Sequence, residues 1–82
     1  MVVFVALGSG AVAFVAGRKV GGAVRRNRAR RILRAAWREV RPRVRGGHDI
    51  AFVAREAITG ARTQDLVAEM NDLLIRARVM RS

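Results

Sequence analysis

The chain has 82 residues, enough for one small domain but too few for a deep, enclosed active site. It contains no cysteine and one histidine, which excludes disulfides and leaves zinc without ligands, and this composition is compatible with a reducing cytoplasm. The formal net charge of +11 argues against an inert neutral surface and predicts a polyanionic partner, either nucleic acid or an anionic membrane.

The first sixteen residues are almost wholly apolar. Residues 2–7 (VVFVAL) and 11–16 (AVAFVA) are rich in β-branched side chains and flank Gly8-Ser9-Gly10, a pattern that predicts a β-hairpin. Neither run alternates with polar residues, so we expect both faces to be covered, or one face to await a partner. Membrane insertion is the weaker interpretation, because the segment is too short for a spanning helix and is interrupted by glycines.

A helix is predicted from Ala23 to Arg41. Its apolar residues, at positions 29, 32, 33, 36, 37 and 40, recur with helical period and fill an arc of about 140° at about 100° per residue. Arginines at positions 26, 30, 34, 38 and 41 fill an adjacent arc of about 120° by the same count. Pro42 disfavours helical geometry at the residue before it, so the helix should end there.

The rest of the chain predicts one more strand and one more helix. Residues 43–48 indicate a glycine-containing loop, and residues 49–54 (DIAFVA) indicate a buried strand. Thr63 is the expected N-cap of a last helix, with Asp65 in its first turn and apolar residues at 66, 70, 73, 74 and 77. We therefore expect the order β-β-α-β-α in a single domain that covers residues 1–82.

No group of side chains predicts catalysis. Ser9 and Ser82 have no activating neighbours, and His48 is expected to be an ordinary residue at the entry to a strand. The acids at positions 65, 69 and 72 share one helix face and could hold Mg²⁺ weakly, but a solvated acidic face is the stronger interpretation.

The basic charge is concentrated in one third of the chain. Residues 18–45 contain twelve Lys or Arg and a single acid, Glu39, whereas the other five arginines are matched by five acids. Arginines four residues apart repel one another along a helix, and because guanidinium groups bind phosphate bidentately, this cost favours nucleic-acid binding. The alternative is a solvated face enriched in arginine by a coding bias, since the chain has sixteen Arg and one Lys. Such a bias does not explain why this stretch contains a single acid.

Residues 17–34 (GRKVGGAVRRNRARRILR) resemble the signature of the protein subunit of bacterial ribonuclease P. In that signature a basic pair, an Ile/Val-Gly step and Ala-Val precede Arg-Asn-Arg-x-Lys/Arg-Arg. Residues 49–55 and the helix from Thr63 also resemble the family, so the likeness covers about residues 11–76. Gly17 and Gly22 stand where the family usually has Ser and Asn. Family members begin with a basic, aromatic-bearing helix, so this chain is expected to be N-terminally short.

The resemblance implies an α+β fold. It would be a small two-layer α/β sandwich of order β-β-α-β-α, with a left-handed β-α-β crossover, similar to ribosomal proteins. It also implies a cytoplasmic ribonucleoprotein endonuclease that removes the 5′ leader from precursor tRNA. In that family the RNA subunit is the catalyst and works with Mg²⁺, while the protein subunit binds the catalytic RNA and the leader. No catalytic or metal-ligating residue is therefore expected in the protein.

The resemblance also divides the basic residues by partner. Arg26, Arg30 and Arg34 would lie toward the leader, whereas Arg28 and Arg31 would lie closer to the catalytic RNA, together with the basic pair at 18 and 19. The predicted RNA-binding residues are Arg18, Lys19, Arg25, Arg26, Asn27, Arg28, Arg30, Arg31, Arg34 and Arg38.

Two other functions compete with this one. The main alternative is a ribosomal-type RNA-binding module without a processing role, and the less favoured one is a basic amphipathic peptide on anionic membranes. No membrane partner is expected under the main interpretation. Self-association through the apolar N-terminal hairpin is expected if one of its faces is uncovered.

Overall fold

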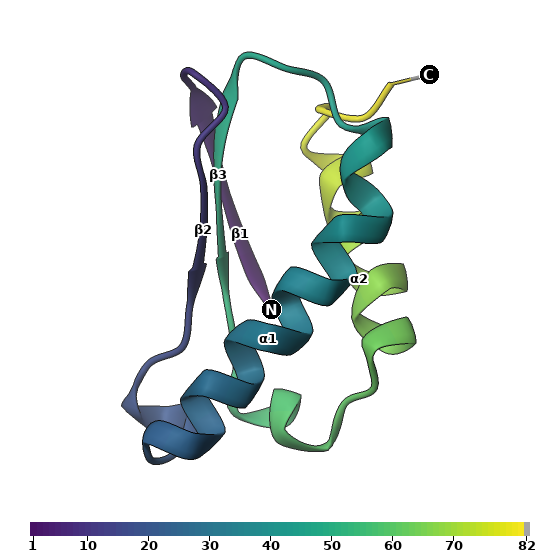
Figure 1. Ribbon diagram of the computed structural model, residues 1–82. Helices are drawn as coiled ribbons and strands as arrows, with labels where there is room; N and C mark the ends of the chain where they lie inside the picture. Colours follow the sequence, from purple (N-terminus) through teal and green to yellow (C-terminus); the bar gives the residue numbers. More distant parts are fainter. Residues whose placement is uncertain (82) are drawn as a thin grey trace.

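A computed structural model of the protein describes residues 1–81, apart from the side chains of Ala57 and Thr59, and Ser82 lies outside the described residues. The strands are β1 (Val2–Leu7), β2 (Val12–Val15) and β3 (His48–Val53), and the α-helices are α1 (Ala23–Val40) and α2 (Thr63–Arg76). Short 3-10 helices η1 (Arg18–Val20), η2 (Arg41–Arg43) and η3 (Glu56–Gly60) connect them. Both α-helices lie on the same side of the sheet (Figure 1). The predicted order β-β-α-β-α in two layers is confirmed.

The predicted β-hairpin is wrong. The sheet has the order β1-β3-β2, so β3 lies between the two strands that were expected to pair with each other. β1 runs antiparallel to β3, with Phe4 opposite Ala51, and β2 runs parallel to β3, with Ala13 opposite the same Ala51. The two N-terminal strands thus lie about 10 Å apart, twice the usual spacing of neighbours.

A side chain of β3 holds the loop that replaces the hairpin turn. Asp49 Oδ1 accepts hydrogen bonds from the backbone N–H groups of Gly10 (3.1 Å) and Ala11 (2.9 Å). The Gly8 N–H donates to the Gly47 carbonyl oxygen at 3.0 Å. A side chain at position 8 would clash with the Asp49 carboxylate, because its Cβ would lie 2.0 Å from Oδ2. Because of Gly8 and Asp49, the chain crosses the end of β3, and β2 does not fold back onto β1.

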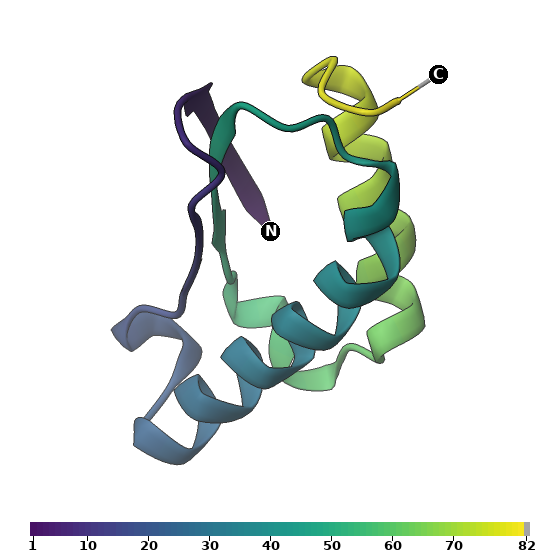
Figure 2. The ribbon, with the colours of Figure 1, turned by 45° about the horizontal axis from the view of Figure 1, so that its top comes forward.

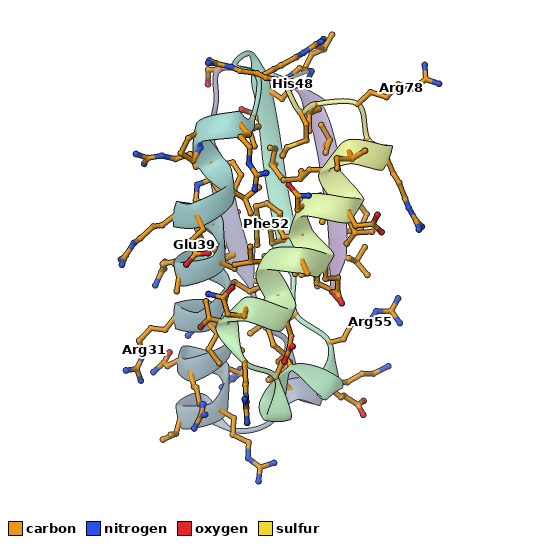
Figure 3. The ribbon with its side chains drawn as sticks, turned by 90° about the vertical axis from the view of Figure 1, so that its right-hand side faces the viewer. Arg31, Glu39, His48, Phe52, Arg55 and Arg78 are labelled. Atoms are coloured by element: carbon orange, nitrogen blue, oxygen red, sulfur yellow. The ribbon has the colours of Figure 1, made fainter. Side chains whose placement is uncertain are left out.

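The connection from β2 through α1 to β3 joins two parallel strands. Figure 3 views the sheet from the helix side, with β2 and β3 both pointing down and β3 to the right of β2. When the picture is turned upside down, so that both strands point up, β3 lies to the left of β2. This left-handed crossover matches the expectation, although such connections are right-handed in nearly all proteins.

The core lies between the sheet and the two helices. Phe52 of β3 is at its centre with no exposed surface, stacked on Phe14 of β2 (5.8 Å between centroids) and tilted against Trp37 of α1 (5.4 Å). Leu33 of α1 and Leu74 of α2 are also fully buried. The sequence left two alternatives for the apolar strands, in which either both faces of the sheet are covered or one face is open. In the structure, the described residues cover one face.

The opposite face of the sheet is apolar and open within residues 1–81. Phe4 is 61% exposed there, and its neighbours Ala13 and Ala51 line a shallow hollow of about 530 Å³ with it. No α-helix among the described residues combines the length and the apolar composition that a membrane span would need.

The start of α2 differs from the prediction by one residue. Arg62, not Thr63, is the N-cap, and its backbone N–H donates to Asp65 Oδ2 at 3.2 Å. Thr63 is the first helical residue. The prediction failed because the carboxylate of Asp65, three residues on, caps the helix in place of a threonine hydroxyl. The expected acid in the first turn is confirmed.

Candidate nucleic-acid interface

Helix α1 presents most of the predicted site residues from one rigid element. Ala29, Leu33, Ala36 and Val40 are buried against the sheet and α2, which fixes the helix in place. The rest of its surface carries seven arginines and one acid, the exposed Glu39. The buried stripe thus sets how every guanidinium around the helix is directed.

One row of arginines lies along the β2 edge of α1. The guanidinium carbon of Arg34 lies 5.6 Å from the centroid of the Phe14 ring of β2, a cation–π contact. Arg30 precedes it by one helical turn and Arg26 by two, and both are half-buried. Arg30 donates a hydrogen bond to the Asn27 side-chain oxygen, which orients its guanidinium. We call Arg26, Arg30 and Arg34 the β2-side row.

Three of the other predicted arginines of α1 border a groove toward α2. Arg25, Arg28 and Ile32 line a hollow of about 260 Å³ against Ile58 of η3. An adjoining hollow of about 330 Å³ has Arg28 and Ile32 in its wall as well, and it reaches Thr63 at the start of α2. We call the two hollows together the α1–α2 groove. Its walls combine guanidinium groups with the positive end of the α2 dipole, so they suit an anion.

Arg31 and Arg38 complete the basic surface of α1. Arg31 lines the second hollow of the α1–α2 groove and extends outward from the helix (Figure 3). Arg38 is exposed one turn after Arg34.

The basic pair Arg18 and Lys19 is exposed in η1, beside the first turn of α1. Figure 2 shows η1 and the start of α1 together at one end of the molecule. Gly21 connects them with a φ of 137°, a conformation that favours glycine, and the Arg25 side chain packs over it. A Cβ at position 21 would lie 2.6 Å from Arg25 Cδ. Gly21 therefore positions Arg25, a role that the sequence analysis missed although a glycine pair directly before a helix could have signalled it.

The acids of α2 each have a separate structural partner. Asp65 caps the helix, Glu69 Oε1 lies 2.5 Å from the amino group of Met1, and Asp72 forms a salt bridge with Arg76 at 3.3 Å. Among the described residues, no group of three His, Asp or Glu side chains is arranged to hold a metal ion. The ring of His48 contacts the Gly46 carbonyl oxygen at 3.1 Å. The described surface thus presents an array of guanidinium groups, carried mainly by one helix, that can bind phosphates.

Comparison with known proteins identifies the family. The model of the family "Ribonuclease P" matches residues 1–78. The ribonuclease P protein component of Pelotomaculum thermopropionicum is 42% identical over 69 residues, and that match covers 84% of this chain and 62% of the relative. The component from Symbiobacterium thermophilum is 45% identical over 69 residues, covering 84% of this chain and 60% of the relative. The chain spans about 60% of the length of these curated relatives.

Solved structures share the fold. The RNase P protein from Thermotoga maritima, in complex with 1-(4-fluorophenyl)-2-thiourea, superposes with a TM-score of 0.75 at 23% identity over 90% of this chain and 76% of that one. The Staphylococcus aureus RNase P protein gives a TM-score of 0.76 at 20% identity, over 96% and 75% of the two chains. On the match of the family model and of the sequence relatives, the chain belongs to the ribonuclease P protein family.

Proposed function

We propose that the chain acts as the protein subunit of ribonuclease P, which binds the catalytic RNA and the 5′ leader of precursor tRNA. The observation that carries this proposal is the distribution of arginines around α1, seven against one acid, on a helix whose buried stripe leaves them directed outward. In this role the RNA subunit performs the Mg²⁺-dependent hydrolysis, and the protein supplies positively charged contacts. The proposal places the protein in the cytoplasm as a single RNA-binding domain.

The physical basis is the affinity of guanidinium groups for phosphate. Each guanidinium can donate two parallel hydrogen bonds to one phosphate and displaces condensed counterions from the RNA. Repulsion between arginines one turn apart destabilises the free helix, and a polyanion removes that repulsion. The repulsion that destabilises the isolated protein is thus relieved on binding, and this relief contributes to the affinity for RNA.

The two sides of α1 fit the two proposed partners. The β2-side row lies at the edge of the sheet, where a single strand could pass from the guanidinium groups to the open apolar face, so we assign it to the leader. The α1–α2 groove faces away from that edge, and we assign it to the catalytic RNA together with Arg18 and Lys19. Mg²⁺ in this scheme is held by the RNA, in keeping with the separate partners of the α2 acids.

Reconstitution tests the function. Cleavage of a precursor tRNA by an in vitro transcribed bacterial ribonuclease P RNA should be faster with the protein than without it at low Mg²⁺. Equal rates with and without the protein would refute the proposal. Preference for a leader-bearing precursor over mature tRNA separates this role from that of a ribosomal-type RNA-binding module, which predicts none.

A matched pair of variants tests the division of the helix. Arg28→Gln and Arg34→Gln each remove one charge from an exposed side chain of α1. Arg28→Gln should weaken binding to the catalytic RNA more, because Arg28 lines the α1–α2 groove. Arg34→Gln should weaken leader binding more, because its guanidinium lies over Phe14 at the β2 edge. Equal losses on both ligands would show that the two sides are not specialised.

A further inference from the structure

A second basic cluster forms where the chain leaves α1 and where it leaves α2. Val44 and Met80 form an antiparallel bridge, flanked by hydrogen bonds from the Arg45 N–H to the Val79 carbonyl oxygen and from the Arg81 N–H to the Arg43 carbonyl oxygen, both 2.7 Å. Val79 is buried and Val44 and Met80 are half-buried, so this bridge is anchored to the core. The arginines around it are exposed. They are Arg41, Arg43, Arg45, Arg78 and Arg81, and we call them the terminal patch.

Five like charges are thus held together by backbone pairing. Residues 41–47 and 77–81 contain no acid, so neither segment supplies a counter-charge of its own. A favourable interaction with the helix dipoles explains basic residues in the last turn of a helix, but that effect falls off beyond it. Arg43, Arg45 and Arg81 lie outside both α-helices. Helix capping therefore does not account for the patch.

Arg78 strengthens the case, because it stands at a position that favours glycine. Its φ of 60° is the only positive value at a non-glycine residue in the described chain. The bonds from the Arg78 N–H to the Ile75 carbonyl oxygen (3.0 Å) and from the Val79 N–H to the Leu74 carbonyl oxygen (3.3 Å) close α2 as a Schellman motif, in which glycine is the usual residue at this place. Its side chain extends from the molecule into solvent (Figure 3). Arginine is unfavourable in this backbone conformation, so its presence at position 78 indicates that its positive charge is used.

The terminal patch and the basic pair of η1 lie at opposite ends of the molecule. Figures 1 and 2 show residues 79–81 and the end of α1 at one end, with η1 and the start of α1 at the other. The helix between them has 18 residues, which corresponds to about 27 Å.

We propose that the terminal patch is a second phosphate-binding surface, which contacts a segment of the catalytic RNA different from the one at η1 and the start of α1. The protein then holds two RNA segments about 27 Å apart, the length of α1. This inference rests on the proposed function, since it takes the catalytic RNA as the partner. The partner's relevant chemistry is the phosphodiester backbone, and base identity plays no part.

A charge-matched pair of single variants tests the patch. Arg81→Gln removes one charge from it and leaves the backbone pairing intact. Arg76→Gln removes one charge outside it, from an exposed side chain that forms a salt bridge with Asp72. Binding to an in vitro transcribed bacterial ribonuclease P RNA is measured against NaCl concentration, with circular dichroism as the check on folding.

The patch variant should bind roughly fivefold more weakly at 0.1 M NaCl, with a log–log salt slope shallower by about 0.7, as expected for one lost phosphate contact. The control variant should stay within about twofold of the wild type, since it loses no phosphate contact. If the two variants bind alike while the wild type binds and accelerates cleavage, the patch proposal is overturned and the proposed function stands. If the wild type does not bind the RNA, both are overturned.

Two further measurements test the patch at other positions. Arg78→Gly should raise the melting temperature by roughly 5 °C and still weaken RNA binding; unchanged binding would count against the patch. Because the chain has no cysteine, Ala77→Cys and Ala23→Cys give unique tethering points for iron–EDTA beside the patch and at the start of α1. The two tethers should cleave different segments of the RNA. Cleavage of the same segment, or none from position 77, would contradict the proposal.

Discussion

Replacing Arg31 with glutamine should make the free protein more stable and its RNA complex weaker. Arg31 is exposed and lies three residues from both Arg28 and Arg34 on α1, so its charge is repelled by both. Removing two such pairs should stabilise the fold by roughly 0.5–1 kcal/mol at low salt. For a domain of this size, that gain raises the melting temperature by about 2–8 °C.

The same substitution removes one guanidinium from the proposed RNA-binding surface. Loss of a single phosphate contact should reduce affinity for the catalytic RNA by roughly fivefold at 0.1 M salt and make the log–log salt slope shallower by about 0.7. Thermal unfolding followed by circular dichroism gives the first quantity, and filter binding at several salt concentrations gives the second.

The two effects have opposite signs, which makes the prediction selective. A solvated face with no ligand would show the gain in stability but no loss of RNA affinity. A purely structural arginine would show a loss of stability. Either result would refute the reasoning. The gain in melting temperature should also vanish in about 1 M NaCl, where the screening length falls to about 3 Å; a gain that persists there would not be electrostatic.

Three further predictions follow from single positions. Gly21→Ala should destabilise the fold by roughly 1–2 kcal/mol in a denaturant titration, because φ is 137° there and the new Cβ would meet Arg25; an unchanged midpoint would contradict the strain. Asp49→Ala should cost about 0.5–1.5 kcal/mol by removing the acceptor of two exposed loop N–H groups, whereas Asp49→Asn should cost less because it keeps an acceptor oxygen; equal losses would refute this role. Phe4→Ser should reduce concentration-dependent self-association in sedimentation velocity, since Phe4 is 61% exposed on the open sheet face; a wild type that stays monomeric at every concentration would contradict that expectation.

The sequence predicted those elements whose signals are local. Helix α1 combines a strong 3.6-residue period with Pro42, which lies two residues beyond its observed end, so its boundaries were predicted to within one residue. The strand pairing was missed because a Gly-Ser-Gly link between two apolar runs has the same local pattern whether the runs pair or not. The insertion of β3 between them depends on contacts such as those of Asp49 with the loop at Gly10, which lie 39 residues apart in sequence.

The sequence located the arginines of α1 but not the side chains around them, and the binding of RNA by these arginines stays a prediction. The single acid among twelve basic residues in positions 18–45 was enough to select the arginines of α1. Their environment depends on the tertiary fold, because Phe14 beneath Arg34 and Ile58 opposite Arg28 come from distant segments. The terminal patch escaped prediction for the same reason, since a single bridge between Val44 and Met80 assembles it. The expected roles of individual arginines toward leader or catalytic RNA remain predictions.

Leader recognition tests the central claim most directly. The affinity of a bacterial ribonuclease P RNA for a precursor tRNA with a 5′ leader, and for the mature tRNA, would be measured with and without this protein. We predict that the protein tightens binding of the precursor more than that of the mature tRNA, and that Arg34→Gln reduces this difference. An equal effect of the protein on both tRNAs, or no effect on either, would contradict the account.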